Sequence, residues 1–167
     1  GRAMIEALEE APFTGPKGPI AWRRADLDLD AVDDDAVLAL LERDRPEVVV
    51  HAAAWTDVDG CARDPVLAMR RNGEATGAVA RACESRGVDL VYVSTNEVFD
   101  GRRTDGGGYG RFDVRHPANP YGASKAEGEV QAEAAYAFEE DGTIARLAVV
   151  RTSWLHGPPG NDFPAKI

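Results

Sequence analysis

The chain has 167 residues, 44% of them hydrophobic, which suits one domain with a buried core. Its 29 acidic residues outnumber 19 basic ones, and the net charge of −10 repels polyphosphates, so we expect no nucleic-acid partner. Cys61 and Cys83 stand apart from each other and from any histidine cluster, and no apolar run reaches membrane-spanning length. We therefore expect a cytoplasmic protein with no disulfide framework, no metal site and no membrane partner.

Four elements are expected in the first third of the chain. Residues 1–9 carry apolar side chains at helical spacing, and residues 20–24 form a short strand candidate after a segment broken by glycine and proline. Three acids, Asp33–Asp35, begin a second helix, which Pro46 ends. Residues 47–54, EVVVHAAA, are nearly all apolar and predict a strand buried on both faces of a parallel sheet.

Strands and helices continue to alternate in the rest of the chain. We expect a helix over 66–86, a buried strand over 88–95, a flexible loop at 104–110, a helix over 121–138 and a strand within 143–154. Strand–helix alternation with short connections is typical of an α/β fold. The predicted fold class is therefore a Rossmann-like, doubly wound parallel sheet.

A tyrosine and a lysine lie four residues apart in the expected helix. Tyr121 and Lys125 therefore share one helix face. A neighbouring ammonium favours the phenolate of a tyrosine, whose ordinary pKa is about 10, so the pair can act as a general acid toward a carbonyl oxygen. Ser94 and Thr95 end the preceding strand at the edge where open α/β sheets bind ligands, and a hydroxyl there can donate to the same oxygen. The alternative is an ordinary pair of surface side chains.

Four segments in chain order carry a family resemblance: HAAAWTDVD, VYVSTNEVFDG, NPYGASKAEGE and RTSWLHGPPGNDF. Together they resemble the extended short-chain dehydrogenase/reductases, and among these the dTDP-4-dehydrorhamnose reductases. The likeness covers nearly the whole chain. It implies an NAD(P)H-dependent oxidoreductase that reduces a 4-keto nucleotide sugar in deoxysugar or rhamnose biosynthesis.

The resemblance also implies a catalytic set of Thr95, Tyr121 and Lys125. Tyr121 would protonate the sugar ketone, Lys125 would lower the tyrosine pKa and bind the nicotinamide ribose, and Thr95 would orient the carbonyl. The matching cofactor-binding residues are Asp26 and Leu27 beside the adenine, Ala52, Ala53 and Ala54 along the dinucleotide, Asn72 on the helix beside the cofactor, and Ser94. The three alanines could instead serve tight strand–helix packing, and Asn72 could be a solvated helix residue.

Three residues are expected near the sugar. Asn96 and Glu97 stand where many family members have an aspartate and a tyrosine, so the identity of the sugar stays open. Trp154 follows the last expected strand, and its aromatic face could cover an apolar sugar face or pack against a further domain.

Two arginines favour NADPH over NADH as the cofactor. In dinucleotide folds an acid after the second strand bonds the ribose 2′-hydroxyl, whereas an arginine accommodates a 2′-phosphate. Arg23 and Arg24 follow the first strand candidate directly, and a guanidinium can bond a phosphate with two parallel hydrogen bonds. The alternative is that both arginines are solvated surface charges.

A doubly wound sheet normally opens on a strand and a glycine-rich turn, whereas this sequence opens on an expected helix, so we expect that strand and that turn to be missing from it. We expect residues 1–167 to be an NAD(P)-binding Rossmann-like domain, truncated at both ends and without most of a substrate domain, and to be inactive alone. Two alternatives stay open: a nucleotide-sugar epimerase or dehydratase of the same family, and a non-catalytic regulatory subunit like that of methionine adenosyltransferase. A homodimer is compatible with the resemblance.

Overall fold

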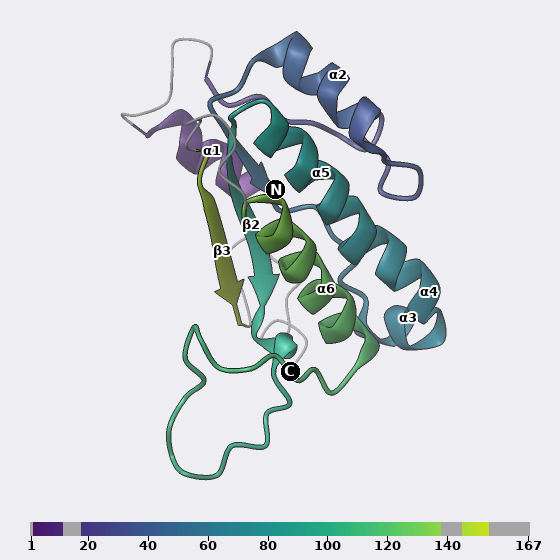
Figure 1. Ribbon diagram of the computed structural model, residues 1–167, viewed down its shortest axis with the longest axis vertical. Helices are drawn as coiled ribbons and strands as arrows, with labels where there is room; N and C mark the ends of the chain where they lie inside the picture. The colour runs from purple at the N-terminus through teal and green to yellow at the C-terminus, as the bar shows by residue number, and fades with distance from the viewer. Residues whose placement is uncertain (1, 12–17, 138–144, 154–167) are drawn as a thin grey trace.

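The computed structural model describes residues 2–11, 18–137 and 145–153. In this part of the chain, three parallel strands form one sheet in the order β1 (Val48–His51), β2 (Asp89–Thr95) and β3 (Leu147–Thr152) (Figure 1). The register pairs His51 with Tyr92 and Thr95 with Thr152. Because all three strands run in the same direction, their carboxyl ends meet at one edge of the sheet.

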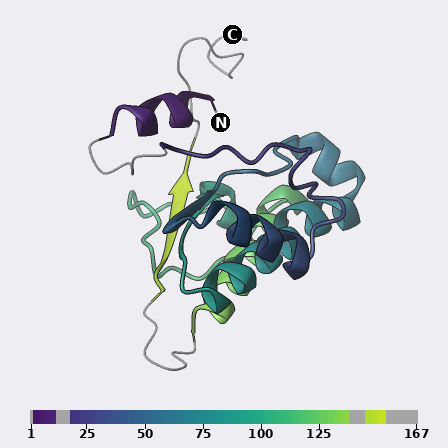
Figure 2. The ribbon, with the colours of Figure 1, turned by 90° about the horizontal axis from the view of Figure 1, so that it is seen from above.

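Helices cover the sheet from one side. α5 (Ala75–Ser85) and α6 (Pro120–Ala135) both contact β2, and α2 (Asp34–Asp44) packs on α5. Figure 2 shows α1 (Arg2–Glu9) set apart from these helices. The buried cluster between helices and sheet is small and apolar, and it includes Val37, Leu41, Val79, Cys83 and Leu90. The parallel α/β architecture that the sequence predicts is confirmed.

The helices begin where short polar side chains can cap them. Asp33 accepts a hydrogen bond from the Ala36 amide over 2.8 Å and starts α2, as its acidic run predicts. Arg45 then ends α2 in the left-handed region, with φ of 49°, directly before Pro46. Asn119 caps α6 in the same way, so that the helix begins at Pro120.

The prediction of a strand at residues 20–24 is wrong. The segment is irregular, and the chain turns at its end, where the amides of Asp26 and Leu27 both donate to the Arg23 carbonyl at 2.8 and 3.0 Å. The indole of Trp22 donates to Asp44 over 2.7 Å. The Arg23 carbonyl is thus bonded within a local turn, and among the described residues no strand pairs with residues 20–24.

The prediction of a helix over 66–86 is confirmed, and the helix contains a π-helical stretch that the sequence pattern did not indicate. The segment forms α4 (Pro65–Ala68), a π-helix η1 (Met69–Glu74) and then α5. The predicted strand at 47–54 ends early, at His51, and a short helix α3 (Val58–Arg63) follows it, which the sequence analysis did not anticipate. Asp57 caps α3 by accepting from the Gly60 amide, and this acid three residues ahead was the available signal.

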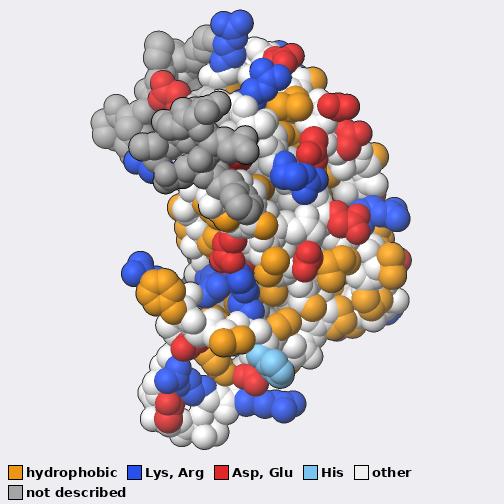
Figure 3. All heavy atoms as spheres, in the orientation of Figure 1, with side chains coloured by type: hydrophobic (Ala, Val, Ile, Leu, Met, Phe, Trp, Pro, Cys, Tyr) orange, Lys and Arg blue, Asp and Glu red, His pale blue; other side chains and the backbone are white. Residues whose placement is uncertain are grey.

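The loop predicted at 104–110 has no regular structure, but Arg103 organises it. Its guanidinium contacts Asp105 and Asp113, at 2.9 Å each, and donates to the Gly108 carbonyl. Figure 3 shows basic and acidic side chains interspersed over the visible face, including this projecting loop. Within the described residues, no helix combines the length and apolar character needed to cross a membrane.

Candidate active site

The three expected catalytic residues lie where β2 meets the start of α6. Thr95 is the last residue of β2 and only 6% exposed, Tyr121 is in the first turn of α6, and Lys125 lies one turn later. The carboxyl edge of the sheet therefore holds all three, as the order of elements requires.

Tyr121 is half-buried, and its pKa lies above the ordinary value. Burial is the main cause, since it disfavours the charged phenolate. Thr95 interacts with the phenol and lowers the pKa, while Cys61 and Glu97 raise it further. In this arrangement Lys125 does not provide the lowering that the resemblance implies. The phenol is therefore held in its protonated form.

Lys125 is buried, and its ammonium group points at β2. Its Nζ donates to the Val93 carbonyl over 2.8 Å and lies 4.2 Å from the centroid of the Tyr92 ring. Burial lowers the pKa of Lys125 to about 8, although Glu129 acts to raise it. A lysine with such a pKa can change its charge near neutral pH.

Asn72, expected beside the cofactor, is buried, and its side chain is hydrogen-bonded within the protein. It is 1% exposed, and its amide bonds the Trp55 backbone twice, accepting from the nitrogen at 2.8 Å and donating to the oxygen at 3.0 Å. It also donates to the Ser124 hydroxyl, which in turn donates to the Tyr121 carbonyl. The π-helix η1 thus ties the segment after β1 to the helix that carries Tyr121 and Lys125.

A second buried chain of polar groups lies under the same helix. The Thr76 hydroxyl donates to the Asn72 carbonyl over 2.6 Å, so it can only accept from His51, whose Nε2 lies 3.2 Å away. The His51 ring also stacks on Tyr92. Burial, assisted by the charge of Lys125, lowers the pKa of His51 to about 3, so the imidazole is neutral.

The sequence analysis missed a buried carboxylate behind the site. Glu129 is 0% exposed and is held by a two-bond ion pair with Arg151, at 2.9 and 2.7 Å, and by Arg115. Burial acts to raise the pKa of Glu129, but Arg151, Ser94 and Arg115 together hold it below its ordinary value. Its position four residues after Lys125 was the available signal.

Ser94, expected at the cofactor, faces this carboxylate. The residue is 3% exposed, and its carbonyl accepts from the Thr152 hydroxyl over 3.1 Å. Its own hydroxyl lies near enough to Glu129 to lower the pKa of that carboxyl, yet it forms no hydrogen bond of ordinary geometry with the described residues. Ser94 therefore lies in the protein interior, at the carboxyl edge of the sheet.

Two of the residues expected near the sugar follow Thr95 directly. Asn96 and Glu97 lie in the short 3-10 helix η2 (Asn96–Val98). Asn96 is exposed, whereas Glu97 accepts a hydrogen bond from the Asn119 side chain over 2.7 Å. Trp154 lies outside the described residues.

The residues expected to hold the dinucleotide are open to solvent in part. Ala52 and Ala53 follow β1 and are exposed. Small side chains at this edge let a ligand approach the backbone, so the segment fits a dinucleotide. The remaining residues of this set lie in the turn after Trp22: Arg23, Arg24 and Asp26 are exposed, and Leu27 packs on the buried cluster.

Acids already surround the exposed arginines. Arg24 has a side chain 78% exposed and contacts Asp28 and Asp30 at 3.7 and 3.5 Å. Asp26 accepts from the Arg23 amide and from Arg43. Exposed pairs of this kind are weak, so a phosphate can displace them.

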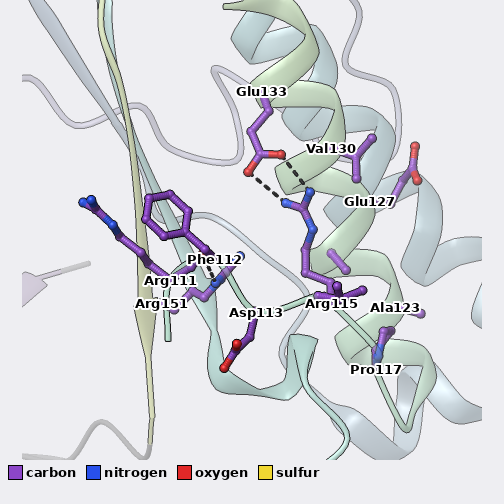
Figure 4. Close-up of a pocket in the computed structure, with 12 residues that line it drawn as sticks. Arg111, Phe112, Asp113, Arg115, Pro117, Ala123, Glu127, Val130, Glu133 and Arg151 are labelled. Atoms are coloured by element: carbon purple, nitrogen blue, oxygen red, sulfur yellow. Dashed lines mark hydrogen bonds and ion pairs between the residues drawn. The ribbon is translucent and has the colours of Figure 1, made fainter. Parts of the chain in front are cut away.

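A hollow of about 580 Å³ lies on another face of α6 (Figure 4). Arg115 reaches across it to Glu133 with two hydrogen bonds of 2.9 and 2.8 Å. Phe112 and Val130 also line it. None of Thr95, Tyr121 and Lys125 lines this hollow, so it is separate from the expected catalytic edge.

Known proteins similar to this chain include a reductase and a subunit of methionine adenosyltransferase 2. The dTDP-4-dehydrorhamnose reductase of Streptomyces griseus is 40% identical over 170 residues, covering 100% of this chain and 52% of that protein. The zebrafish (Danio rerio) methionine adenosyltransferase 2 subunit beta is 41% identical over 98 residues, covering 59% of this chain and 29% of that protein. The chain spans about half the length of the first of these relatives.

The fold also matches a solved structure. The crystal structure of dTDP-4-dehydrorhamnose reductase from Bacillus anthracis, in complex with NADP, superposes with a TM-score of 0.78 at 32% identity, covering 96% of this chain and 53% of that one. The Rossmann-like fold is thereby confirmed. The RmlD substrate binding domain family matches residues 4–167, which is almost the whole chain. The chain therefore belongs to the RmlD substrate binding domain family.

Proposed function

We propose that the intact protein is an NADPH-dependent reductase of a 4-keto nucleotide sugar of the dTDP-4-dehydrorhamnose type. The observation that carries this proposal is the gathering of Thr95, Tyr121 and Lys125 at the junction of β2 and α6. The similarity to the Streptomyces griseus and Bacillus anthracis reductases supports it.

When bound, reduced nicotinamide supplies a hydride to the ketone carbon. The residues of the chain supply the proton and the geometry. Tyr121, whose raised pKa keeps it protonated, donates its phenolic proton to the ketone oxygen. The Thr95 hydroxyl donates a hydrogen bond to the same oxygen and orients the carbonyl. The Thr95 hydroxyl, which lowers the pKa of Tyr121, also favours the phenolate that remains after proton transfer. Lys125, one helical turn away, would bind the nicotinamide ribose.

The chain would supply the dinucleotide-binding part of the enzyme. Ala52 and Ala53 would lie along the dinucleotide because they are small and exposed, with Ala54, Asp26, Leu27, Asn72 and Ser94 as further cofactor residues. Arg23 and Arg24 would bind a 2′-phosphate, which makes NADPH preferred over NADH. The NADP bound to the Bacillus anthracis reductase supports this choice. Sugar contacts by Asn96 and Trp154, a homodimer and a cytoplasmic location stay predictions.

A direct assay tests the function. The intact protein is supplied with dTDP-4-dehydrorhamnose and NADPH, and loss of reduced nicotinamide is followed by its absorbance while the sugar product is identified. Stoichiometric oxidation of NADPH with reduction of the ketone is expected. Conversion of the sugar without net oxidation would indicate an epimerase or dehydratase instead.

A second candidate function has one observation in its favour. The similarity to methionine adenosyltransferase 2 subunit beta raises the possibility of a non-catalytic regulatory subunit. Nucleotide binding without any ketone reduction would favour that role over the reductase.

A further inference from the structure

Glu97 connects the two elements that carry the proposed catalytic residues. Its backbone amide donates to the Thr95 hydroxyl over 3.2 Å, and its carboxylate accepts from the Asn119 side chain over 2.7 Å. Asn119 is the residue that caps α6, because its other side-chain atom accepts from the Gly122 amide over 2.7 Å. One side chain therefore joins the end of β2 to the first turn of α6.

The two elements are also in direct backbone contact at this point. A Cβ atom added to Gly122 would collide with the Glu97 carbonyl oxygen, so only glycine allows η2 to lie this close to α6. Tyr121 directly precedes Gly122 in the helix. Any loosening at this contact changes the position of the phenol relative to the Thr95 hydroxyl.

We propose that Glu97 is a positioning residue, which holds Tyr121 against Thr95 through Asn119 instead of contacting the sugar. The effect of Glu97 on the rate of ketone reduction rests on the proposed function. The side chain is partly buried and already bonded, whereas its neighbour Asn96 is exposed. A tyrosine, common here in the resembling family, could not accept the same charge-assisted hydrogen bond.

The charge of Glu97 has a second effect on Tyr121. The groups that act on the phenol are Thr95 from β2, Cys61 from α3 and Glu97 from η2. Lys125 lies on the same helix as Tyr121, but its ammonium donates to the Val93 carbonyl of β2. Burial, Cys61 and Glu97 raise the pKa of Tyr121, whereas Thr95 lowers it. Removing the negative charge of Glu97 therefore makes the phenol easier to ionise.

Three variants of the intact protein distinguish the effect of Glu97 on the position of Tyr121 from the effect of its charge. Glu97→Gln keeps an oxygen that can accept from Asn119 but removes the charge. Glu97→Ala removes both the acceptor oxygen and the charge. Asn119→Ser keeps a good helix cap but loses the donor to Glu97. Glu42→Gln serves as the matched control, because Glu42 is an exposed acid on α2, paired only with Arg86 at the surface.

Positioning predicts a specific pattern of ketone reduction. Glu97→Ala and Asn119→Ser each lower kcat by about 10–100-fold with little change in the KM for the nucleotide sugar, and the double variant is no worse than either single one. Glu97→Gln keeps most of kcat. Equal loss in Glu97→Gln and Glu97→Ala with a raised sugar KM would mean that Glu97 contacts the sugar, and full activity in Asn119→Ser would also overturn the proposal.

A second readout does not depend on activity. The ionisation of Tyr121 is followed by NMR of ring-carbon-labelled tyrosine, assigned with Tyr121→Phe. We expect its pKa to fall in Glu97→Gln, which loses the charge, and to rise in Asn119→Ser, because the phenol then moves away from the Thr95 hydroxyl that lowers its pKa. It should stay unchanged in Glu42→Gln. An unchanged pKa in Asn119→Ser overturns the proposal even if the protein reduces no sugar, so failure of the proposed function and failure of this inference remain distinguishable.

Discussion

The Lys125 ammonium lies over the face of Tyr92, 4.2 Å from the centre of the ring, and is fixed by a hydrogen bond to the next residue of β2, Val93. The cation is thus held by the strand, and the pKa of Lys125 falls to about 8 because of its burial. Any role that needs its charge is therefore lost as the pH rises through that value.

The first prediction concerns this charge. We expect Lys125→Ala to lower both the affinity for NADPH and the rate of ketone reduction in the intact protein, because the proposed contact of the ammonium with the nicotinamide ribose holds the cofactor in place for the reaction. In the unsubstituted protein, cofactor affinity should decline above pH 8, where the ammonium loses its proton. Isothermal titration with NADPH over a series of pH values measures this. A flat profile would contradict the role of Lys125 in binding.

Tyr121 is expected to be the proton donor. Tyr121→Phe removes the transferable proton while keeping the ring, so it should reduce kcat by about 10²–10⁴-fold and leave NADPH binding nearly intact. Steady-state kinetics and cofactor titration on the same preparation provide the two measurements. Retention of more than about a tenth of the activity would show that another group supplies the proton.

Arg23 and Arg24 are expected to select the cofactor. Replacing both by alanine should weaken NADPH selectively and leave NADH unaffected, because only NADPH carries the 2′-phosphate. The matched control is a double alanine variant of Arg81 and Arg86, which are also exposed and paired with acids of α2. The ratio of kcat/KM for the two cofactors is measured in each variant. If this ratio is the same in the unsubstituted protein and in both double variants, Arg23 and Arg24 do not select the cofactor.

His51 should make stability depend on pH. Its pKa in the folded protein is about 3, against about 6.5 when unfolded, so the unfolded chain binds more protons between these values. The contribution to stability is present above about pH 6.5 and is lost as the pH falls toward 3, at about 1.4 kcal/mol per pH unit. Urea unfolding at several pH values should show a shallower acid decline in His51→Gln.

The control for this prediction is His116→Gln. The His116 side chain is 79% exposed, so its substitution should leave the pH dependence unchanged. If stability falls with pH as steeply in the His51 variant as in the unsubstituted protein, groups other than His51 cause the sensitivity to acid.

Glu129 depends on its arginine partners. Arg151→Met leaves a fully buried carboxylate with Arg115 as its remaining partner, and we expect a loss of stability of about 3–5 kcal/mol, the usual effect of breaking a buried pair. Arg146→Met, which removes an exposed arginine, should change stability little. Thermal and urea unfolding measure both. Adding Glu129→Gln to Arg151→Met should restore much of the loss, and no restoration would rule out the buried charge as its cause.

Much of the catalytic edge could be predicted from the sequence because it depends on local signals. A polar cap before Pro120 and a hydroxyl pair at the end of an apolar run are enough to place Thr95 and Tyr121 at the same edge of a parallel sheet. The pKa of Tyr121 could not be predicted in this way. It depends on burial and on neighbours from other elements, which the spacing of tyrosine and lysine does not contain.

The misses have a common physical origin in long-range contacts. Residues 20–24 have an apolar pattern suited to a strand, but the indole of Trp22 bonds Asp44, 22 residues away, and the chain turns instead. Within the π-helical stretch η1, Asn72 bonds the Trp55 backbone, 17 residues earlier. Neither Asp44 nor Trp55 is close enough in the sequence to enter a local pattern.

The π-helical turn at Met69–Glu74 fixes the length of the segment between α4 and α5. A π turn contains about one more residue than an α turn, so deleting one residue here would close η1 into a regular helix. The extra residue and the wider turn offset each other, so α5 would keep nearly the same rotation about its axis, and Val79 and Cys83 would stay packed on the sheet. The deletion would instead move Asn72 away from the Trp55 backbone and from Ser124. Evolution can therefore remove the extra residue without disturbing the core, but only by losing this polar connection to α6.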